Sequence, residues 1–317
     1  MDIQKELDKA IRDFEKENCD IESGYETEGS PKRENYLSNA AWNKFYDDMA
    51  RYNMNAFKRY SDGAGGEMRQ GKNGTPPKMA SFGSSSRMIY NLVMKDEVKE
   101  RFLFEEKLAT TIGGEANLDG FMQKGNTYIF VEAKCREPYA TKQNDIKDVY
   151  RPLYAEITKS PDVDLVCDCG ESNDKNEMKV TFKLGDQFIN HFDMKQMICH
   201  LLAVGTAVLT NHYKEIENTK DEDIKLYFIY LIYDPQNLKF SNNNSGKEIV
   251  RIYNGIFDFC KGNENQFFKN LFKVVLEFLQ SEKKLGTDKN VSKIVDNFNF
   301  CICSQENFKE KCQSLLN

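Results

Sequence analysis

Two acidic residues and a lysine near the middle of the chain have the types and spacing of a metal-dependent hydrolytic site. Asp119 lies in the segment EANLDGFMQK, and Glu132 and Lys134 lie in the next segment, TYIFVEAKC. Gly125 and Asn126 separate the two segments, and both tolerate the positive φ that a two-residue hairpin turn requires. The sequence therefore predicts a β-hairpin with its turn at these two residues.

This turn determines which residues face each other across the hairpin. It pairs Lys124 with Thr127 and, further from the turn, Asp119 with Glu132. Opposed residues share one face of a sheet, with Cβ atoms about 4.5 to 5.5 Å apart, so two carboxylates there repel each other unless a cation lies between them. Because side chains alternate along a strand, Lys134 lies on the same face as Glu132, roughly 6.6 Å further along.

Such an arrangement suits the hydrolysis of phosphodiesters. The carboxylates of Asp119 and Glu132 and the backbone carbonyl of Ala133 are oxygen ligands of the kind that Mg²⁺ prefers, and Mn²⁺ is a suitable substitute. A cation there neutralises the scissile phosphate and acidifies a bound water. Lys134 then orients that water or stabilises charge in the transition state. The structural alternative is a solvated strand, on which Glu-x-Lys is a common pattern.

The segments before the hairpin are expected to be mainly helical. An amphipathic helix covers the first 20 or so residues, and a second covers residues 36–60. Residues 61–86 are rich in Gly, Ser and Pro, which predicts a loop. A long helix is expected over residues 88–112, because serines precede it and a Gly-Gly pair follows it.

The segments after the hairpin predict helices around a buried strand. An apolar helix is expected over residues 192–210, followed by the strand IKLYFIYLIYD. That strand is apolar almost throughout, which indicates a central strand covered on both faces. From about Gly246 the chain predicts two or three further helices. A mixed sheet with helices on both faces follows from this order.

Composition places the chain among ordinary globular proteins. Of its 317 residues, 40% are hydrophobic and 30% are charged. No apolar run approaches the roughly 18 residues that a membrane span needs, and the charged N-terminus lacks a signal peptide's apolar core. We therefore expect a cytoplasmic protein with no membrane partner.

Two close pairs of cysteines raise the question of a zinc site. Cys167/Cys169 and Cys301/Cys303 both have C-x-C spacing, not the C-x2-C spacing usual in zinc ribbons. Both pairs lie in apolar, strand-like segments, where cysteine often serves as a small hydrophobic residue. The sequence favours this second interpretation.

The net charge of −6 conceals a basic segment in the predicted loop region. Only Asp62 and Glu67 oppose its six positive residues, which are Lys58, Arg59, Arg69, Lys72, Lys78 and Arg87. Phosphate contacts come from local patches, so this segment could contact DNA beside an acidic centre. A solvated loop is the alternative.

The segments LDG and VEAK resemble the signature of the PD-(D/E)xK, or restriction-endonuclease-like, nuclease superfamily. The segments SSSRMIYNL, FEEKL, EPY and MKQMICHLL are similar to a group of uncharacterised bacterial proteins described as restriction endonucleases. The resemblance covers roughly residues 84–235. It implies a three-layer α/β/α core with a mixed central sheet and additional N- and C-terminal helices. The implied organisation is a helical N-terminal region over 1–86, a nuclease core over 87–240 and a helical C-terminal extension over 241–317.

The resemblance also implies roles for individual residues. Asp119, Glu132 and Lys134 match the motif's aspartate, second acid and lysine. Many members carry a further metal-binding glutamate on the first core helix, for which Glu105 is favoured and Glu106 stays open. Leu118 stands where the motif has proline, a position that varies in the superfamily.

Residues of the apolar helix complete the candidate set. Gln196 and Lys195 occupy the place where related nucleases have auxiliary polar residues, and Gln196 is favoured because it needs a hydrogen-bond partner if buried. His200 lies four residues later on the same face of the helix. A supporting role at the site and an ordinary core position are both open for this histidine. Residues 140–190 would be an insertion that could serve substrate recognition.

The function expected from these features is a Mg²⁺-dependent DNA endonuclease of restriction or defence type. Cleavage of both strands by subunits with one site each would need a two-fold homodimer. An exonuclease or repair nuclease with the same site is the alternative among enzymes. A catalytically silent nucleic-acid-binding protein of the same fold is the alternative outside them.

Overall fold

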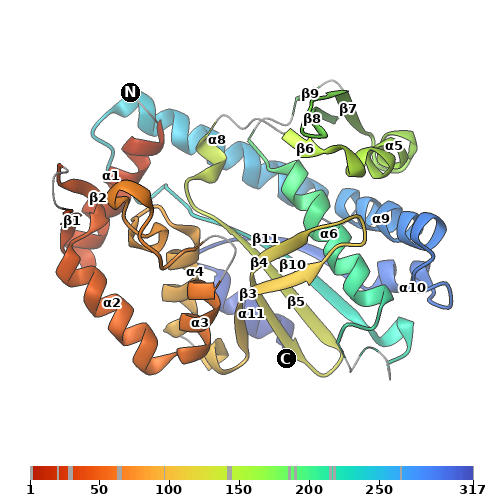
Figure 1. Ribbon diagram of the computed structural model, residues 1–317, viewed down its shortest axis with the longest axis horizontal. Coiled ribbons are helices and arrows are strands. Elements are labelled where there is room, and N and C mark those ends of the chain that lie inside the picture. The colour runs from red at the N-terminus through yellow and green to blue at the C-terminus, as the bar shows by residue number, and fades with distance from the viewer. Residues whose placement is uncertain are drawn as a thin grey trace.

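A mixed five-stranded sheet forms the centre of the computed structural model (Figure 1). The structure describes all residues except 1–2, 20, 28–30, 63–65, 96, 141–144, 185–186, 189–190, 214–215, 217–218, 265 and 317. The strand order is β11-β10-β5-β4-β3. The strands are β3 (Phe102–Ala109), β4 (Glu115–Lys124), β5 (Thr127–Lys134), β10 (Lys225–Ile232) and β11 (Phe298–Ser304). The prediction of an α/β fold with a mixed sheet is confirmed.

The predicted hairpin is present as β4 and β5. Lys124 pairs with Thr127, and the antiparallel ladder continues to the pair Gly120–Val131. Gly125 has a φ of 58°, the left-handed conformation that the turn demands. The predicted register is therefore confirmed along this ladder.

The apolar strand β10 lies in the interior of the sheet, as its composition predicted. It runs parallel to β5 on one side and to β11 on the other. Helices cover both of its faces, so it needs no polar side.

Helices α6 (Met194–Leu209) and α9 (Phe267–Lys283) cover one face of the sheet, where α6 contacts β3 and β4, and α9 contacts β11 (Figure 1). The two helices approach closely at Gly205, where a Cβ atom would lie 3.0 Å from the Leu276 side chain. On the other face, α4 (Ser85–Met94) contacts β5, and α11 (Phe308–Leu316) contacts α4 and β11. Helix α6 confirms the helix predicted over residues 192–210.

The N-terminal helices lie beside the sheet, and α1 (Ile3–Cys19) contacts α8 (Asn243–Asn263). A short hairpin of β1 (Ser23–Tyr25) and β2 (Arg33–Leu37) precedes α2 (Asn39–Tyr52) and α3 (Met54–Asp62). The single helix predicted over residues 36–60 is therefore wrong. The break falls at Asn53, whose side-chain oxygen accepts a hydrogen bond from the N–H of Ala56 and caps α3.

A second small sheet occupies most of the predicted insertion over residues 140–190, parts of which lie outside the described residues. It is formed by β6 (Asp145–Lys147), β7 (Leu165–Ser172), β8 (Glu177–Leu184) and β9 (Gln187–Phe188). Helix α5 (Arg151–Lys159) contacts β7. Cys167 and Cys169 thus lie on a strand of this small sheet, whereas Cys301 and Cys303 lie on a strand of the central sheet.

The C-terminal region is not purely helical. Besides α8, α9, α11 and the short α10 (Val291–Asp296), it supplies strand β11 to the central sheet. Cys301 and Cys303 are buried thiols on this strand, which fits the interpretation as small hydrophobic residues. No helix in the described part of the chain is long and apolar enough to cross a membrane.

The helix predicted over residues 88–112 is wrong in its second half. Helix α4 ends at Met94, and β3 follows from Phe102. Phe102, Phe104 and Leu108 are buried, whereas Leu103 and Lys107 are exposed. This alternation has the period of a half-buried strand, and it outweighs the helical propensity of FEEKL. Glu105 consequently lies on a strand of the sheet.

Candidate active site

A polar cavity of about 360 Å³ is lined by six residues that the sequence singled out, namely Glu105, Asp119, Glu132, Ala133, Lys134 and Gln196. Glu106 and His200 are not part of its lining. We call it the acidic cavity. Its lining comes from strands β3, β4 and β5, helix α6, the loop after α3 and the start of α4: Glu67, Lys78, Gly83, Ser84, Ser85, Ser86, Glu105, Asn117, Asp119, Glu132, Ala133, Lys134, Arg136, Glu137 and Gln196. Three strands, two helices and a loop thus contribute polar residues to one space.

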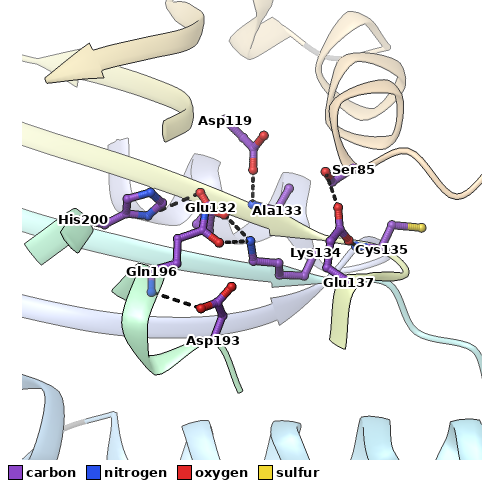
Figure 2. Close-up of polar contacts among 10 residues, drawn as sticks. All are labelled: Ser85, Asp119, Glu132, Ala133, Lys134, Cys135, Glu137, Asp193, Gln196 and His200. Atoms are coloured by element: carbon purple, nitrogen blue, oxygen red, sulfur yellow. Dashed lines mark hydrogen bonds and ion pairs between the residues drawn. The ribbon is translucent and has the colours of Figure 1, made fainter. Parts of the chain in front are cut away.

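Asp119 is fixed to the end of β5 by a hydrogen bond from the main chain. The ladder between β4 and β5 stops at Gly120, and the next contact is the Ala133 N–H donating to Asp119 Oδ2 at 2.7 Å (Figure 2). The N–H and carbonyl of one strand residue point toward the same neighbouring strand. The Ala133 carbonyl is therefore directed to the side of β5 on which Asp119 lies.

Lys134 is held between a carboxylate and an amide. Its Nζ donates to Glu132 Oε1 at 2.5 Å and to Gln196 Oε1 at 2.5 Å (Figure 2). Burial lowers the pKa of Lys134, but the charges of Glu132 and of the neighbouring acids Glu137, Asp193 and Asp119 together more than offset this effect, so its pKa is raised. The lysine stays a cation at neutral pH. Gln196 has the hydrogen-bond partner that its place in an apolar helix predicted.

The position of Gln196 depends on how α6 begins. Asp193 caps this helix, and its Oδ1 accepts a hydrogen bond from the Gln196 N–H at 3.1 Å. The cap fixes the first turn of the helix, from which the Gln196 side chain reaches Lys134.

His200 contacts the site through Glu132. Its Nδ1 lies 3.4 Å from Glu132 Oε2, and both atoms are buried without a hydrogen-bond partner among the described residues. Burial lowers the pKa of His200, so the ring is neutral at neutral pH. Glu132 Oε2 is thus an acid oxygen adjacent to this ring nitrogen, although the two atoms do not form a hydrogen bond. The structure thus favours a supporting position over a purely apolar core position.

Glu105 enters the cavity from an irregular point in β3. Its φ is 50°, a left-handed conformation that is strained for glutamate. Arg59 of α3 braces this point, because its Nη1 donates to the carbonyls of Phe104 at 3.1 Å and Glu105 at 3.3 Å. The same nitrogen donates to Glu106 Oε2 at 2.7 Å. Glu105 therefore lines the cavity, whereas Glu106 is paired with Arg59 and lies outside the lining.

The acids of the cavity outnumber the cations that neutralise them. Lys134 pairs with Glu132, and Lys78 pairs with Glu67 at 3.2 Å. Neither Glu105 nor the outer oxygen of Asp119 has an ion-pair partner within the described part of the chain. The carboxylates of Glu105 and Asp119 are thus among those left without compensating charge.

The pKa values of these two acids reflect that excess. Burial, followed by the charges of Glu132 and Glu105, raises the pKa of Asp119 well above its usual range. Burial, followed by the charges of Glu67 and Glu132, raises the pKa of Glu105 to about 7. A cation bound in the cavity would relieve this repulsion and return both acids to the ionised state.

The oxygens present fit a hard divalent cation. Asp119, Glu105 and the Ala133 carbonyl are available, and Glu132 Oε2 and Asn117 Oδ1 are buried oxygens with no hydrogen-bond partner among the described residues. No three His, Cys, Asp or Glu side chains in the described ranges already converge as a complete metal centre. Mg²⁺ commonly keeps several waters and takes only one or two carboxylates, so a complete protein shell is not required.

Similarity to known proteins gives no family for this chain. A scan against protein-family models, a search of curated proteins and a search of solved structures each found no match. The function is therefore inferred from the geometry of the acidic cavity.

The structure corrects the expectation for the basic segment. Arg87 is buried, with 3% of its side chain exposed, and its guanidinium is bound to both carboxylate oxygens of Glu15. Arg59 is committed to Glu106, and Lys78 to Glu67. Of the six positive residues, these three serve the interior or the cavity edge, so the segment is not a free basic patch.

Several residues of the cavity were not found by the motif, and three of them show why. Asn117 lies two residues before Asp119 on the same strand, so strand alternation could have placed it on the same face. Glu67 comes from the loop after α3, and only its charge distinguished it in the sequence. Arg136 follows Lys134 by two residues. No pattern in the sequence showed that the chain beyond β5 stays at the cavity.

Proposed function

We propose that this protein is a metal-dependent phosphodiesterase that cleaves DNA, with Mg²⁺ as its cofactor. The observation that carries the proposal is the shared placement of Asp119, Glu132 and Lys134 on adjacent strands around one cavity. The excess of carboxylates there favours a divalent cation. The restriction-endonuclease-like core, with helices on both faces of the mixed sheet, belongs to the same proposal.

Six residues of the cavity have distinct parts in this chemistry. Asp119, Glu132, Glu105 and the Ala133 carbonyl would hold the cation. When bound, Mg²⁺ supplies neutralisation of the scissile phosphate and a lower pKa for a bound water. Lys134 is a buried cation whose Nζ can hydrogen-bond a phosphate oxygen or the attacking water. Gln196 fixes the ammonium in place.

The direct test is cleavage of supercoiled plasmid and of linear duplex by the purified protein with Mg²⁺ or Mn²⁺. We expect the unaltered protein to nick and linearise the plasmid. In Asp119→Asn and Lys134→Met we expect the cleavage rate to fall by about 100-fold or more, as for loss of a catalytic group. Asp148→Asn is the matched control, because Asp148 is an acid that directly follows strand β6 of the small second sheet and does not line the acidic cavity.

The other outcomes assign other functions. Degradation of linear but not circular DNA would indicate an exonuclease. Binding of DNA without cleavage in either metal would indicate a catalytically silent binding protein. If the protein neither cleaves nor binds DNA, and titration calorimetry shows no Mn²⁺ binding dependent on Asp119, the proposal is wrong.

A further inference from the structure

The acidic cavity has a second end, where hydrogen-bond donors replace carboxylates. Arg136 and the first residues of α4 form this end, and they share the cavity with Asp119 and Glu132. We call it the donor end and define it as Arg136, Ser84 and Ser86. A nuclease must hold more of its substrate than the phosphate it cleaves, so the chemistry of this end bears on what the substrate is.

Arg136 is anchored on one side and open on the other. Its Nη1 donates to Asp8 Oδ2 at 3.0 Å, and its own carbonyl accepts a hydrogen bond from the Gln4 side chain at 3.1 Å. The Arg136 side chain is 38% exposed, whereas that of Asp8 is 7% exposed. In the described part of the chain, Nε and Nη2 of Arg136 have no hydrogen-bond partner. A guanidinium held in this way can present its free edge to an anion with little loss of side-chain entropy.

Gly83 allows this anchoring. A Cβ atom at Gly83 would lie 2.1 Å from Asp8 Oδ1 and 3.1 Å from Arg136 Cδ. Only glycine leaves room for the ion pair at this position. The lack of a side chain at Gly83 therefore allows Arg136 to be held against Asp8 at the wall of the cavity.

The N-terminus of α4 adds donors beside the guanidinium. Ser84 caps this ten-residue helix, and its Oγ accepts a hydrogen bond from the Arg87 N–H. The N–H groups of Ser85 and Ser86 precede the first intrahelical hydrogen bonds and have no partner within the helix. Ser86 also lines the cavity and is only 5% exposed, and its hydroxyl has no hydrogen-bond partner among the described residues.

One carboxylate at this end is already satisfied. Glu137 accepts hydrogen bonds from Ser85 Oγ at 3.0 Å and from the Cys135 N–H at 2.8 Å (Figure 2). Both of its oxygens are therefore engaged by the protein. The free donors of Arg136 and Ser86 remain available to a ligand.

We propose that the donor end binds a phosphate of the substrate chain adjacent to the scissile phosphate, with Arg136 as its principal ligand. This inference rests on the proposed function. The acidic end needs a cation before it can accept a phosphate, whereas the donor end can accept one directly. The substrate is then a polynucleotide with consecutive phosphates, and small diesters that carry one phosphate use only half of the cavity.

The test compares Arg136→Gln and Arg136→Lys with Arg151→Gln. Arg151 is the matched control, because it also pairs with an aspartate, at 2.8 Å, and its side chain is 40% exposed, but it lies outside the acidic cavity. Kinetics are measured on oligonucleotides and on bis(p-nitrophenyl) phosphate, which has no adjacent phosphate. Binding of the same oligonucleotides is measured in Ca²⁺ as a function of salt concentration.

For Arg136→Gln we expect KM for oligonucleotides to rise on the order of tenfold, as for loss of one charge-assisted hydrogen bond. The ratio of kcat/KM on oligonucleotide to that on the small diester should fall by a similar factor. The slope of log Kd against log salt should decrease by about 1, because one phosphate contact is lost. Arg136→Lys keeps the charge and the pairing with Asp8, so we expect an intermediate KM and an unchanged slope.

Thermal melting separates these effects from misfolding. If Arg136→Gln fails to fold, the raised KM of Arg136→Lys tests the proposal alone. An unchanged substrate ratio and salt slope in a folded Arg136→Gln, while the unaltered protein cleaves DNA, would overturn this inference and leave the proposed function standing. If the unaltered protein cleaves nothing, the proposed function fails, and the salt slope in Ca²⁺ still decides whether Arg136 binds a phosphate.

Discussion

The carboxylate of Asp119 accepts the backbone N–H of Ala133 at 2.7 Å, at the point where the ladder between β4 and β5 ends. A side chain here takes the place of the next main-chain partner. The hydrogen bond ties the acid to β5 and also directs the Ala133 carbonyl toward it. Two ligands of the proposed cation are thus set by one contact that depends on the hairpin register.

This contact allows the charge of Asp119 to be removed without loss of its position. Asparagine in Asp119→Asn retains an oxygen that can accept the Ala133 N–H. Since burial and neighbouring acids raise the pKa of Asp119, its ionised form destabilises the metal-free fold. We expect metal-free Asp119→Asn to be more stable than the unaltered protein at pH 8.

Saturating Mg²⁺ should reverse this order, because only the unaltered protein gains the full binding energy of the cation. Thermal melting with Mg²⁺ and with EDTA checks both parts. A variant that is less stable than the unaltered protein in EDTA would show that Asp119 is a structural acid.

The raised pKa of Glu105 leads us to expect that the stability of the metal-free protein depends on pH. Its pKa is about 7 in the fold, above the ordinary value of 4.5. A raised pKa means that the folded state binds the proton more tightly than the unfolded state does. The stabilisation is therefore complete below about pH 4.5 and is lost as the pH rises through 7. In EDTA, the melting temperature should fall between pH 5 and pH 8, and Glu105→Gln should flatten this dependence.

Glu106→Gln is the control for that experiment, because Glu106 is the neighbouring acid but is paired with Arg59. It should lose stability by about 1 kcal/mol while keeping the pH dependence and the Mn²⁺ affinity. Equal effects of the two substitutions on Mn²⁺ binding would contradict the assignment of Glu105 to the cavity.

The sequence was sufficient for the hairpin, because the Gly125-Asn126 turn and strand alternation are local. It was also sufficient for α6 and β10, whose apolar patterns extend over many residues. It failed where two periodicities competed, and so placed Glu105 on a helix. The contributions of Arg59 and Glu67 depend on how α3 and the loop after it pack against β3, and no local pattern carries that information.

Arg59 supplies a test of the strained backbone in β3. Its Nη1 holds the carbonyls on both sides of the left-handed residue Glu105. Arg59→Met retains much of the side-chain volume but removes these hydrogen bonds. We expect a stability loss of about 1–3 kcal/mol and a fall in Mn²⁺ affinity, since the Glu105 carboxylate is no longer aimed at the cavity.

Arg69→Met is the matched control, because Arg69 is largely exposed and its nearest acid, Asp62, is 3.8 Å away. It should change neither property. If Arg59→Met lowers stability but leaves Mn²⁺ affinity intact, Arg59 braces the fold without positioning Glu105.

Gln196 tests whether the position of the Lys134 ammonium matters for catalysis. In Gln196→Leu the ammonium keeps Glu132 as a partner but loses its amide acceptor. The high pKa of Lys134 depends chiefly on Glu132, so the lysine stays protonated and the pH–rate profile should keep its shape. What changes is the position of the ammonium, because without the Gln196 amide it is no longer held in place beside Glu132 and can move away from the substrate. We expect kcat on plasmid DNA to fall roughly 10- to 100-fold with little change in KM, because the interaction that is lost is realised in the transition state.

Lys195→Met is the control, since the neighbouring Lys195 side chain donates to the Asp145 carbonyl and does not line the cavity. A normal kcat for Gln196→Leu would mean that Glu132 alone suffices to place Lys134.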